Sequence, residues 1–330
     1  MLNPPHILII GAGLIGLSTA DSALRRGAKV TIVDKQSAPA LGTSFSNSGM
    51  LHPSQVEPWD SSASVSELKS LISLAEKSRD LTISRMKELN IPLRKAGCLK
   101  MYNNGKDLLA AKNRYAELGI RAEIRHEPMF GRQHHMLFFP NDSSGDAYDY
   151  ACALARDLES RGASFFFGMR DVVVTELKAI YKADHIVICA GAASPELAKA
   201  FGIDISMKAI AGHALNFEKP DIALPDYPIM HAASHSAMTV LKDHLRLSGS
   251  INVATPDILL DIWRDIAPDI TQALDVPIMQ WTGYRPVIDG NYPLIGPTDI
   301  QGVWLNTGHG HMGWTLCSGS GERLARMMLG

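Results

Sequence analysis

Three glycines near the N-terminus, Gly11, Gly13 and Gly16, have the spacing G-x-G-x-x-G, and Asp34 follows the third glycine by 18 residues. Glycines let a backbone turn tightly and let a phosphate group reach main-chain N–H groups, while a carboxylate accepts hydrogen bonds from a ribose diol. Together these residue types predict the binding of a dinucleotide. An acid in this place favours an unphosphorylated ribose, as in NAD or FAD.

The residues around these glycines predict the elements that position them. Residues 6–10 (HILII) form a short apolar run, which is typical of a buried parallel strand. Apolar residues then recur at helical spacing up to Gly27, and residues 29–34 (KVTIVD) predict a second strand that ends at the acid. Because strand, glycines, helix, strand and acid occur in this order, the prediction is specific. The residues expected to contact the dinucleotide are Gly11, Ala12, Gly13, Leu14, Ile15, Gly16, Asp34 and Lys35.

A second glycine-containing loop, residues 41–53 (LGTSFSNSGMLHP), helps to decide whether the dinucleotide is NAD or FAD. In an NAD dehydrogenase another strand and helix would usually follow here, whereas this loop has no periodicity and is rich in hydroxyl side chains. Such side chains can bind phosphate and ribityl oxygens, and we expect Gly49 to admit a flat ring. The loop therefore favours FAD. The contacts expected from it come from Thr43, Ser44, Ser46, Asn47, Ser48, Gly49 and Met50.

The C-terminal segment, residues 306–321 (NTGHGHMGWTLCSGSG), is a further place where backbone can come close to a ligand. Gly308, Gly310 and Gly313 precede an amphipathic stretch, so we predict a helix that begins here with free N–H groups and the positive end of its dipole. We expect the two ends of the chain to meet at one cofactor, the N-terminal glycines at its diphosphate and this segment at its redox ring.

Four stretches of the chain, in the same order, resemble the D-amino-acid oxidase (DAO) superfamily of FAD-dependent oxidoreductases, and within it the branch of D-amino-acid dehydrogenase small subunits and glycine oxidases. They are GAGLIG…VDK…GTSFSNSG, GDAYDYACALARDLESRGASFFFG, ADHIVICAGAAS and WTGYRPVIDGNYPLIGPT…VWLNTGHGHMGWTLCSGSGERLA. The resemblance implies an α/β fold with a Rossmann-like FAD-binding domain and a smaller substrate domain built on an antiparallel or mixed sheet. The expected boundaries are 1–91, 141–210 and 281–330 for the FAD domain, and 92–140 and 211–280 for the substrate domain.

The resemblance also implies roles for single residues. The backbone of Val172 or Val173 would contact the adenine, and Ala190 and Gly191 would return the chain to the FAD domain. Arg285 stands where relatives bind the substrate carboxylate, and its planar guanidinium can hold both oxygens at once. The residues expected at the flavin are Gly308, Gly310, His311, Met312, Gly313, Trp314 and Thr315.

Three more side chains are candidates for the substrate pocket. Tyr284 would line the pocket or simply pack. His311 would bind the carboxylate, act as a base for the amine or form only a structural hydrogen bond, and His52, at the end of the second loop, would face the substrate.

One departure from the relatives concerns the strand around Ala237. Some glycine oxidases have a carboxylate-binding tyrosine there, and this chain offers His231, His235 and Met238 instead. Arg246 alternates with two leucines, so we expect it to point out of the sheet into solvent.

The implied activity is FAD-dependent oxidative deamination of a D-amino acid, glycine or a cyclic imino acid such as D-proline or hydroxyproline. Hydride would pass from Cα to flavin N5, and the imino acid would hydrolyse to the 2-oxo acid. The electron acceptor would be O2 or a quinone-type carrier. Two other classes stay open, namely an NAD-dependent dehydrogenase and a flavin-binding, non-catalytic subunit of a heteromeric enzyme. Residues 170–191 replace a longer β-meander expected of relatives, so the chain is either a compact enzyme or one that needs a partner subunit.

The composition and the spacing of charges and cysteines argue against several other classes of protein. A formal charge of −2 with no basic run argues against nucleic acid, and four scattered cysteines without a C-x-x-C pair disfavour a metal site. The N-terminus lacks the basic region and cleavage site of a signal peptide. We expect a cytoplasmic enzyme, with peripheral attachment to the inner face of the cytoplasmic membrane left open.

Overall fold

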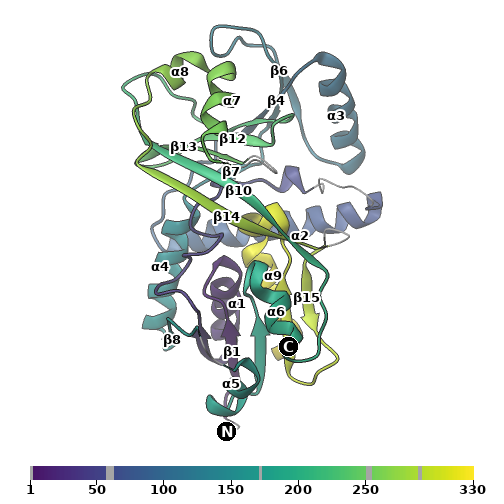
Figure 1. Ribbon diagram of the computed structural model, residues 1–330. Coiled ribbons are helices and arrows are strands. Elements are labelled where there is room, and N and C mark those ends of the chain that lie inside the picture. The colour runs from purple at the N-terminus through teal and green to yellow at the C-terminus, as the bar shows by residue number, and fades with distance from the viewer. Residues whose placement is uncertain (1–2, 57–62, 171–172, 250–254, 289–291) are drawn as a thin grey trace.

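Two β-sheets organise the protein, which we describe from a computed structural model covering residues 3–56, 63–170, 173–249, 255–288 and 292–330. Figure 1 shows two lobes, one above the other, joined by two long strands that run diagonally between them. Both chain ends lie in the lower lobe. The predicted α/β fold, with a Rossmann-like unit and a second, mixed sheet, is confirmed.

The lower lobe is built on a six-stranded sheet in the order β15-β16-β9-β1-β2-β8, in which every pair is parallel except β15 with β16. Its strands are β1 (His6–Ile10), β2 (Lys29–Val33), β8 (Ser164–Phe166), β9 (His185–Ile188), β15 (Leu294–Pro297) and β16 (Val303–Thr307). The helices around it are α1 (Leu14–Arg25), α4 (Ala147–Ser160), α5 (Val174–Ile180), α6 (Ser194–Lys199) and α9 (Gly313–Leu329).

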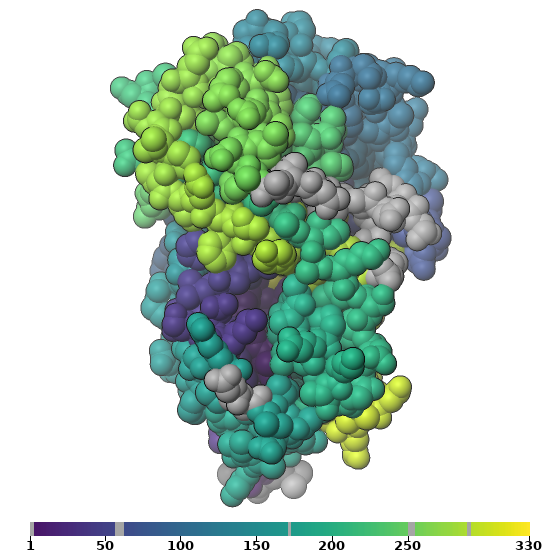
Figure 2. Space-filling model, viewed as in Figure 1, coloured from purple at the N-terminus to yellow at the C-terminus, as the bar shows by residue number. Residues whose placement is uncertain are grey.

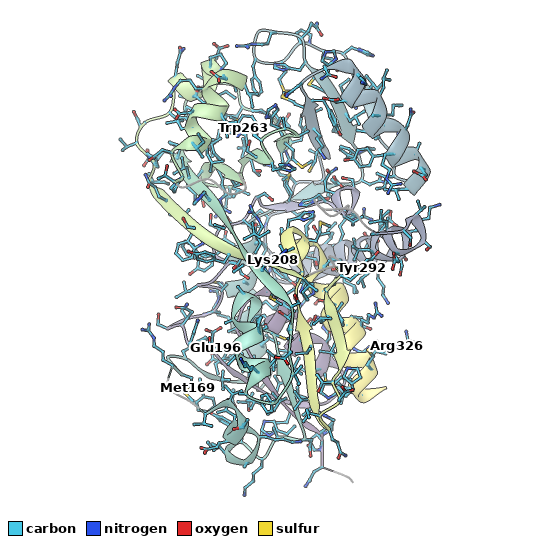
Figure 3. All side chains as sticks on the ribbon, turned by 45° about the vertical axis from the view of Figure 1, so that its right-hand side comes forward. Met169, Glu196, Lys208, Trp263, Tyr292 and Arg326 are labelled. Atoms are coloured by element: carbon cyan, nitrogen blue, oxygen red, sulfur yellow. The ribbon has the colours of Figure 1, made fainter. Side chains whose placement is uncertain are left out.

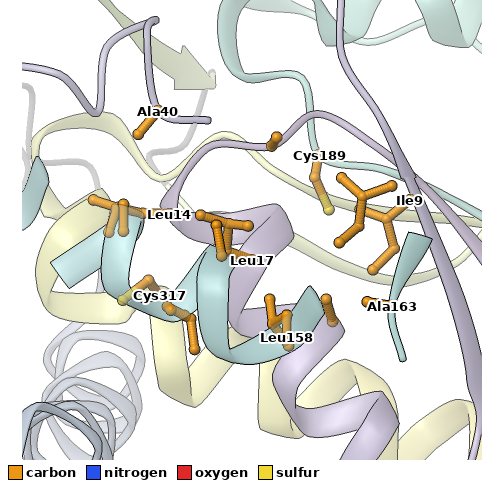
Figure 4. Packing of buried hydrophobic residues seen from close by; sticks show 14 of the residues in the cluster. Ile9, Leu14, Leu17, Ala40, Leu158, Ala163, Cys189 and Cys317 are labelled. Carbon is orange, nitrogen blue, oxygen red and sulfur yellow. The ribbon is translucent and has the colours of Figure 1, made fainter. Parts of the chain in front are cut away.

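Both faces of this sheet are covered, which explains why β1 is a continuous apolar run. Ile7 and Ile9 pack with the cluster formed by α1, α4 and α9, which Figure 4 shows around Leu14 and Leu17. Leu8 and Ile10 point to the opposite face, among residues of α5 and α6. Alternate residues of a strand face opposite sides, so a strand buried on both sides is apolar throughout.

Two C-terminal glycines serve helix packing rather than a ligand. A Cβ on Gly321 would lie 2.7 Å from backbone atoms of Ser18 in α1, and a Cβ on Gly319 would lie 2.6 Å from Ser78 of α2 (Val65–Glu88). The close contact of α9 with α1 brings the two chain ends together. At the start of α2, Ser64 and Glu67 form a capping box.

The upper lobe is built on an eight-stranded sheet in the order β14-β10-β13-β12-β11-β4-β6-β5, antiparallel except for β11 with β4. Its strands are β4 (Cys98–Tyr102), β5 (Glu123–Arg125), β6 (His135–Phe139), β10 (Met207–Glu218), β11 (Ile229–His231), β12 (Ser236–Val240), β13 (His244–Gly249) and β14 (Met279–Ile288). The segments between them also form α3 (Gly105–Leu118), α7 (Ile258–Ile266) and α8 (Pro268–Gln272). One face of this sheet packs against fully buried Trp263 of α7, labelled in the upper lobe of Figure 3.

The expected domain boundaries at 210/211 and 280/281 fall inside β10 and β14, which belong to the larger sheet along their whole length. The division into two domains stays a prediction. Between β8 and β9 the described chain forms the helix α5 and no β-meander. In the parts of the chain that the structure covers, no helix is both long enough and apolar enough to span a bilayer.

Candidate functional site

A cavity of about 830 Å³ lies between the two sheets and is lined by the N-terminal glycine turn, the loop 40–52 and the segment 306–314. In Figure 2 the molecule is hollowed between its two lobes, with purple N-terminal atoms at the base of the hollow. In an open parallel sheet, ligands bind at the carboxyl ends of the strands. Those ends, after β1, β9 and β16, are the places where Gly11, Cys189 and Thr307 line the cavity.

The turn between β1 and α1 has the geometry expected of a phosphate-binding turn. Gly11 has φ +113°, and a Cβ there would lie 2.5 Å from the carbonyl oxygen of Cys189. A Cβ on Gly16 would overlap the carbonyl oxygen of Gly11. Gly13 is different, because a Cβ there would meet only Ser44 Oγ, at 3.2 Å, and the residue faces the cavity at the N-cap of α1. Gly11 and Gly16 are thus required by the turn and its packing, and Gly13 leaves backbone open to a ligand.

The Asp34 carboxylate lies beside this turn, at the end of β2. Its oxygens accept hydrogen bonds from Ala12 N at 2.6 Å and from Gln36 N at 2.8 Å. These bonds hold the carboxylate at the cavity wall. Of the described residues that line the cavity, Asp34 is the only one with a carboxylate.

The hydroxyl-rich loop is fixed by bonds to both lobes. Thr43 Oγ1 donates to Tyr284 O at 2.7 Å, and Ser44 Oγ accepts from Leu14 N at 3.1 Å. The predicted solvent exposure of Arg246 is wrong: it is 3% exposed and donates to Asn47 O at 2.8 Å. Arg246 does face away from its neighbouring leucines, but the hydroxyl-rich loop around Asn47 covers that face of the sheet.

The C-terminal segment enters the cavity through a 3-10 turn (Gly310–Met312) that leads directly into α9. His311 Nε2 lies 2.8 Å from Gln55 O. Because a carbonyl oxygen only accepts hydrogen bonds, Nε2 carries the proton and donates it to Gln55 O. The His52 ring lies parallel to the His311 ring with centroids 6.4 Å apart. The predicted helix start is confirmed, and its first turn faces the cavity through Gly313 and Trp314.

Burial keeps three histidines of this site, His52, His309 and His311, neutral at pH 7. It lowers the pKa of His52 and of His309 to about 3. It also lowers the pKa of His311 to about 4, with smaller effects from the charges of Arg285 and Lys100. At neutral pH the positive charge in this part of the cavity therefore comes from arginine and lysine.

We expect the free energy of unfolding to fall as the pH drops from 6.5 to 4.5. His52, His309 and His311, together with His244 at a pKa of about 4, are neutral in the folded protein but take up protons on unfolding below the ordinary value of 6.5. Asp142 acts in the opposite direction, because burial raises its pKa to about 7 and the folded state keeps its proton more tightly. Uptake of about three protons on unfolding lowers stability by roughly 4 kcal/mol per pH unit near pH 5. Urea unfolding between pH 5 and 7 measures this slope, and a flat profile would contradict the neutral histidines.

Arg285, on β14, reaches across the sheet to the neighbouring strand. Its Nη1 donates to Ala211 O at 3.0 Å, and burial lowers its pKa to about 10, so the side chain stays charged at neutral pH. Gly212 is required here, because a Cβ at this position would overlap the guanidinium. The guanidinium therefore lies over the glycine, at the wall of the cavity.

We expect Gly212→Ala to raise the KM of the substrate about tenfold or more with little change in the thermal midpoint. The added methyl group clashes with the flexible end of Arg285, which can move aside at little cost to folding. The displaced guanidinium then loses a charge-assisted contact to the substrate carboxylate, worth about 1.5–3 kcal/mol. Steady-state kinetics measure KM, and a melting curve of the same preparation measures the thermal midpoint. Unchanged KM would mean that the guanidinium position does not matter.

Most residues predicted for the site lie on this one cavity, and some do not. Those that line it are Gly11, Gly13, Leu14, Ile15, Asp34, Lys35, Thr43, Ser44, Ser46, Asn47, Ser48, Met50, His52, Ala190, Gly191, Tyr284, Arg285, Gly308, Gly310, His311, Gly313 and Trp314. Those that do not line it are Ala12, Gly16, Gly49, Val173, Met312 and Thr315. A Cβ on Gly49 would point towards Leu241 and Gly145 rather than into the cavity. Val173 is exposed at the N-cap of α5, beside Val174, which does line the cavity, and Val172 lies outside the described residues.

The wall of the cavity formed by the eight-stranded sheet and the segment next to it includes residues that the sequence did not single out. Lys100 and Gln55 line the cavity and are hydrogen-bonded to each other at 2.8 Å. His231 and His235 line it as well, whereas Met238 packs on the opposite face of the sheet. A lone lysine within the apolar strand CLKMY is the only local signal for Lys100.

The cavity fits an extended dinucleotide with an aromatic ring at one end. Its volume is in the range of cofactor sites, and its length runs from Asp34 past Gly13 to the start of α9. Several buried polar atoms of its wall have no partner within the described chain. These are Ser46 Oγ, His52 Nδ1, Ser248 Oγ, Trp281 Nε1, Asn306 Oδ1, His309 Nε2 and Trp314 Nε1. Unsatisfied buried groups are rare in proteins, and here they belong to residues that line the cavity.

Comparison with known proteins assigns the chain to a family. Residues 6–327 match the family model DAO, described as FAD dependent oxidoreductase. The chain is 28% identical to a D-amino acid dehydrogenase of Sinorhizobium medicae, over 98% of this chain and 95% of that protein. Among solved structures, glycine oxidase from Geobacillus kaustophilus has a TM-score of 0.82 at 21% identity, covering 97% of this chain and 93% of the other. Iminodiacetate oxidase from Chelativorans sp. BNC1 has a TM-score of 0.78 at 20% identity, covering 98% and 95%. The chain therefore belongs to the DAO family of FAD-dependent oxidoreductases, and its cofactor is FAD rather than NAD.

Proposed function

We propose that this protein catalyses the oxidative deamination of an amino acid, with a D-amino acid, glycine or a cyclic imino acid as the substrate class. The Cα–H bond breaks with its electron pair, the amine nitrogen loses a proton, and the resulting imino acid takes up water to give the 2-oxo acid. An imino acid formed from a primary amine releases ammonia in this step, whereas a cyclic imine opens its ring and keeps the nitrogen as an amine. Bound FAD supplies the acceptor for the hydride.

The observation that carries this proposal is the place of Arg285. Its desolvated guanidinium shares one cavity with the glycine turn of the dinucleotide site and with the start of α9. A planar guanidinium in an apolar wall holds a carboxylate by two charge-assisted hydrogen bonds and so fixes the orientation of the neighbouring Cα. Trp281 and Met230 provide apolar surface in the same cavity.

The two histidines, His52 and His311, serve in this account as neutral walls of the pocket. With pKa values of about 3 and 4 they carry no charge at pH 7 and are weak bases. They exclude water and leave carboxylate binding to Arg285. Tyr284, which is half exposed, lies at the rim of the cavity.

The electron acceptor belongs to the same proposal, and it is O2 or a quinone-type carrier. Relatives and structural neighbours carry both kinds of name, dehydrogenase and oxidase. A cytoplasmic enzyme, with or without a partner subunit and peripheral membrane attachment, agrees with either acceptor.

Anaerobic mixing of the FAD-loaded protein with a panel of D- and L-amino acids, glycine and proline tests the function. We expect at least one member of the proposed class to bleach the visible flavin absorbance within seconds to minutes. A second run, with oxygen or an artificial quinone, identifies the acceptor from the rate at which the colour returns. If no compound bleaches a fully bound flavin, catalysis by this chain alone is rejected and the non-catalytic subunit takes its place.

A further inference from the structure

Besides Arg285, the wall of the cavity on the eight-stranded sheet contains the cation Lys100, which the binding of one α-carboxylate does not use. Lys100 lies on β4, and its Nζ donates to Gln55 Oε1 at 2.8 Å and to Tyr115 OH at 3.1 Å. Tyr115 OH itself donates to Gln55 Oε1 at 3.2 Å. Both partners of the ammonium group are neutral. An ammonium group has three donors, so one donor and the whole charge are left for the cavity that Lys100 lines.

No carboxylate of the described residues lies within 4.0 Å of Lys100 Nζ, and the single carboxylate on the described wall of the cavity is that of Asp34, at the dinucleotide turn. Aromatic rings flank the ammonium, since Nζ lies 5.9 Å from the ring centroids of both Tyr102 and Tyr115. When a substrate fills the cavity and removes water, a cation held only by neutral groups is unfavourable unless the substrate brings an anion.

Lys100 belongs to the same sheet face as the α-carboxylate site. Strand register places Lys100, Met230, Ala237 and Ser248 in one row, and this row continues through Ala214 to Trp281 on β14. Aligned residues of neighbouring strands point to the same face. Arg285 follows Trp281 by four residues and therefore faces the same side.

The fold brings the two cations to one cavity. On a flat sheet the five strand spacings between β4 and β14 would separate these two strands by roughly 24 Å. In the structure, however, the charges of Lys100 and Arg285 both act on the same two imidazoles, those of His235 and His311, and lower their pKa values after burial, which is the largest cause. Gln55 links the two sides directly, since its side chain binds Lys100 and its carbonyl binds His311.

The residues between the two cations leave space for a substrate side chain. Ala237 and Ser248 are small, and at Ala237 the chain lacks the tyrosine that some relatives are expected to carry. A substrate held at Arg285 by its α-carboxylate can therefore extend along this row towards Lys100.

We propose that Lys100 binds an anionic group at the far end of the substrate side chain, so that the natural substrate is a dicarboxylic amino acid. This inference rests on the proposed function and narrows its substrate class. Hydrogen bonds to Gln55 and Tyr115 hold the ammonium group of Lys100 in place. Its positive charge favours a substrate with an acidic side chain over the neutral amide of the same shape.

The test compares isosteric pairs in the configuration that the enzyme oxidises: aspartate with asparagine, glutamate with glutamine, and 2-aminoadipate with its amide. For at least one chain length we expect kcat/KM to favour the acid about 10- to 100-fold, the size of one charge-assisted hydrogen bond. Lys100→Met should bring this ratio close to one, and Lys100→Arg should restore part of it. Lys106→Met, which removes an exposed lysine of the same lobe, should leave the ratio as in the wild type.

A binding measurement gives a readout without turnover. Glutarate should perturb the visible spectrum of the FAD-loaded protein at concentrations about 10- to 100-fold lower than butyrate does, and Lys100→Met should remove the difference. Equal use of acids and amides by the wild type, or a ratio unchanged in Lys100→Met, overturns the inference and leaves amino-acid oxidation intact. If no amino acid bleaches the flavin, the proposed function itself fails.

Discussion

Arg285→Met should lower kcat/KM for the amino-acid substrate roughly 30- to 5,000-fold while FAD stays bound. The guanidinium is half-buried at the cavity wall and is the cation expected to hold the α-carboxylate. Removing one partner of a buried charge pair costs about 2–5 kcal/mol, and methionine keeps most of the volume of the side chain. The loss should be largest in KM, because the contact exists before the reaction begins. Steady-state kinetics and the ratio of flavin to protein absorbance measure the two quantities.

Arg264→Met is the matched control for this experiment. Arg264 lies on α7 with its side chain 56% exposed and pairs with Asp261, so its loss should change neither kinetics nor FAD content. If Arg285→Met kept wild-type kinetics, Arg285 would be removed from the substrate site.

Gly13→Asp should yield a folded protein that has lost its yellow colour. Gly13 can accept a Cβ, since only Ser44 Oγ would lie near it, at 3.2 Å, but the new carboxylate would point into the phosphate-binding turn. Like charges in contact cost several kcal/mol, which corresponds to a loss of FAD affinity of at least about 100-fold. Visible absorbance after gel filtration, with circular dichroism as the measure of folding, checks the result.

Gly13→Asn separates charge from shape, because asparagine has the same size without the charge. We expect it to keep clearly more FAD than Gly13→Asp. Equal FAD content in both variants would show that this turn does not face a diphosphate.

The parts of the fold that depend on local sequence could be predicted. The apolar run of β1, the glycine turn and the period of α1 lie within one stretch of chain, and the capping box of α2 depends on two residues three positions apart. Gly11 and Gly16 are required by contacts inside the same turn, so their spacing alone indicates it.

Predictions for residues whose surroundings come from distant parts of the chain were incomplete or wrong. Alternation correctly separated Arg246 from its leucine neighbours, but it could not reveal that residues near Asn47, about 200 positions earlier, cover the other face. Lys100 and Gln55 carry no motif, and they come to one cavity with Arg285 only when the eight-stranded sheet and the segment that contains Gln55 are in place. The need for Gly212 likewise appears only when the neighbouring strand is in place.

A crystal structure of the FAD-loaded protein with glutarate tests the central claim most directly. We expect the diphosphate at Gly11–Leu14, the flavin ring beside Gly310–Trp314, and the two carboxylates at Arg285 and Lys100. An FAD molecule whose ring lies away from residues 306–315, or a ligand that contacts neither cation, would contradict this account.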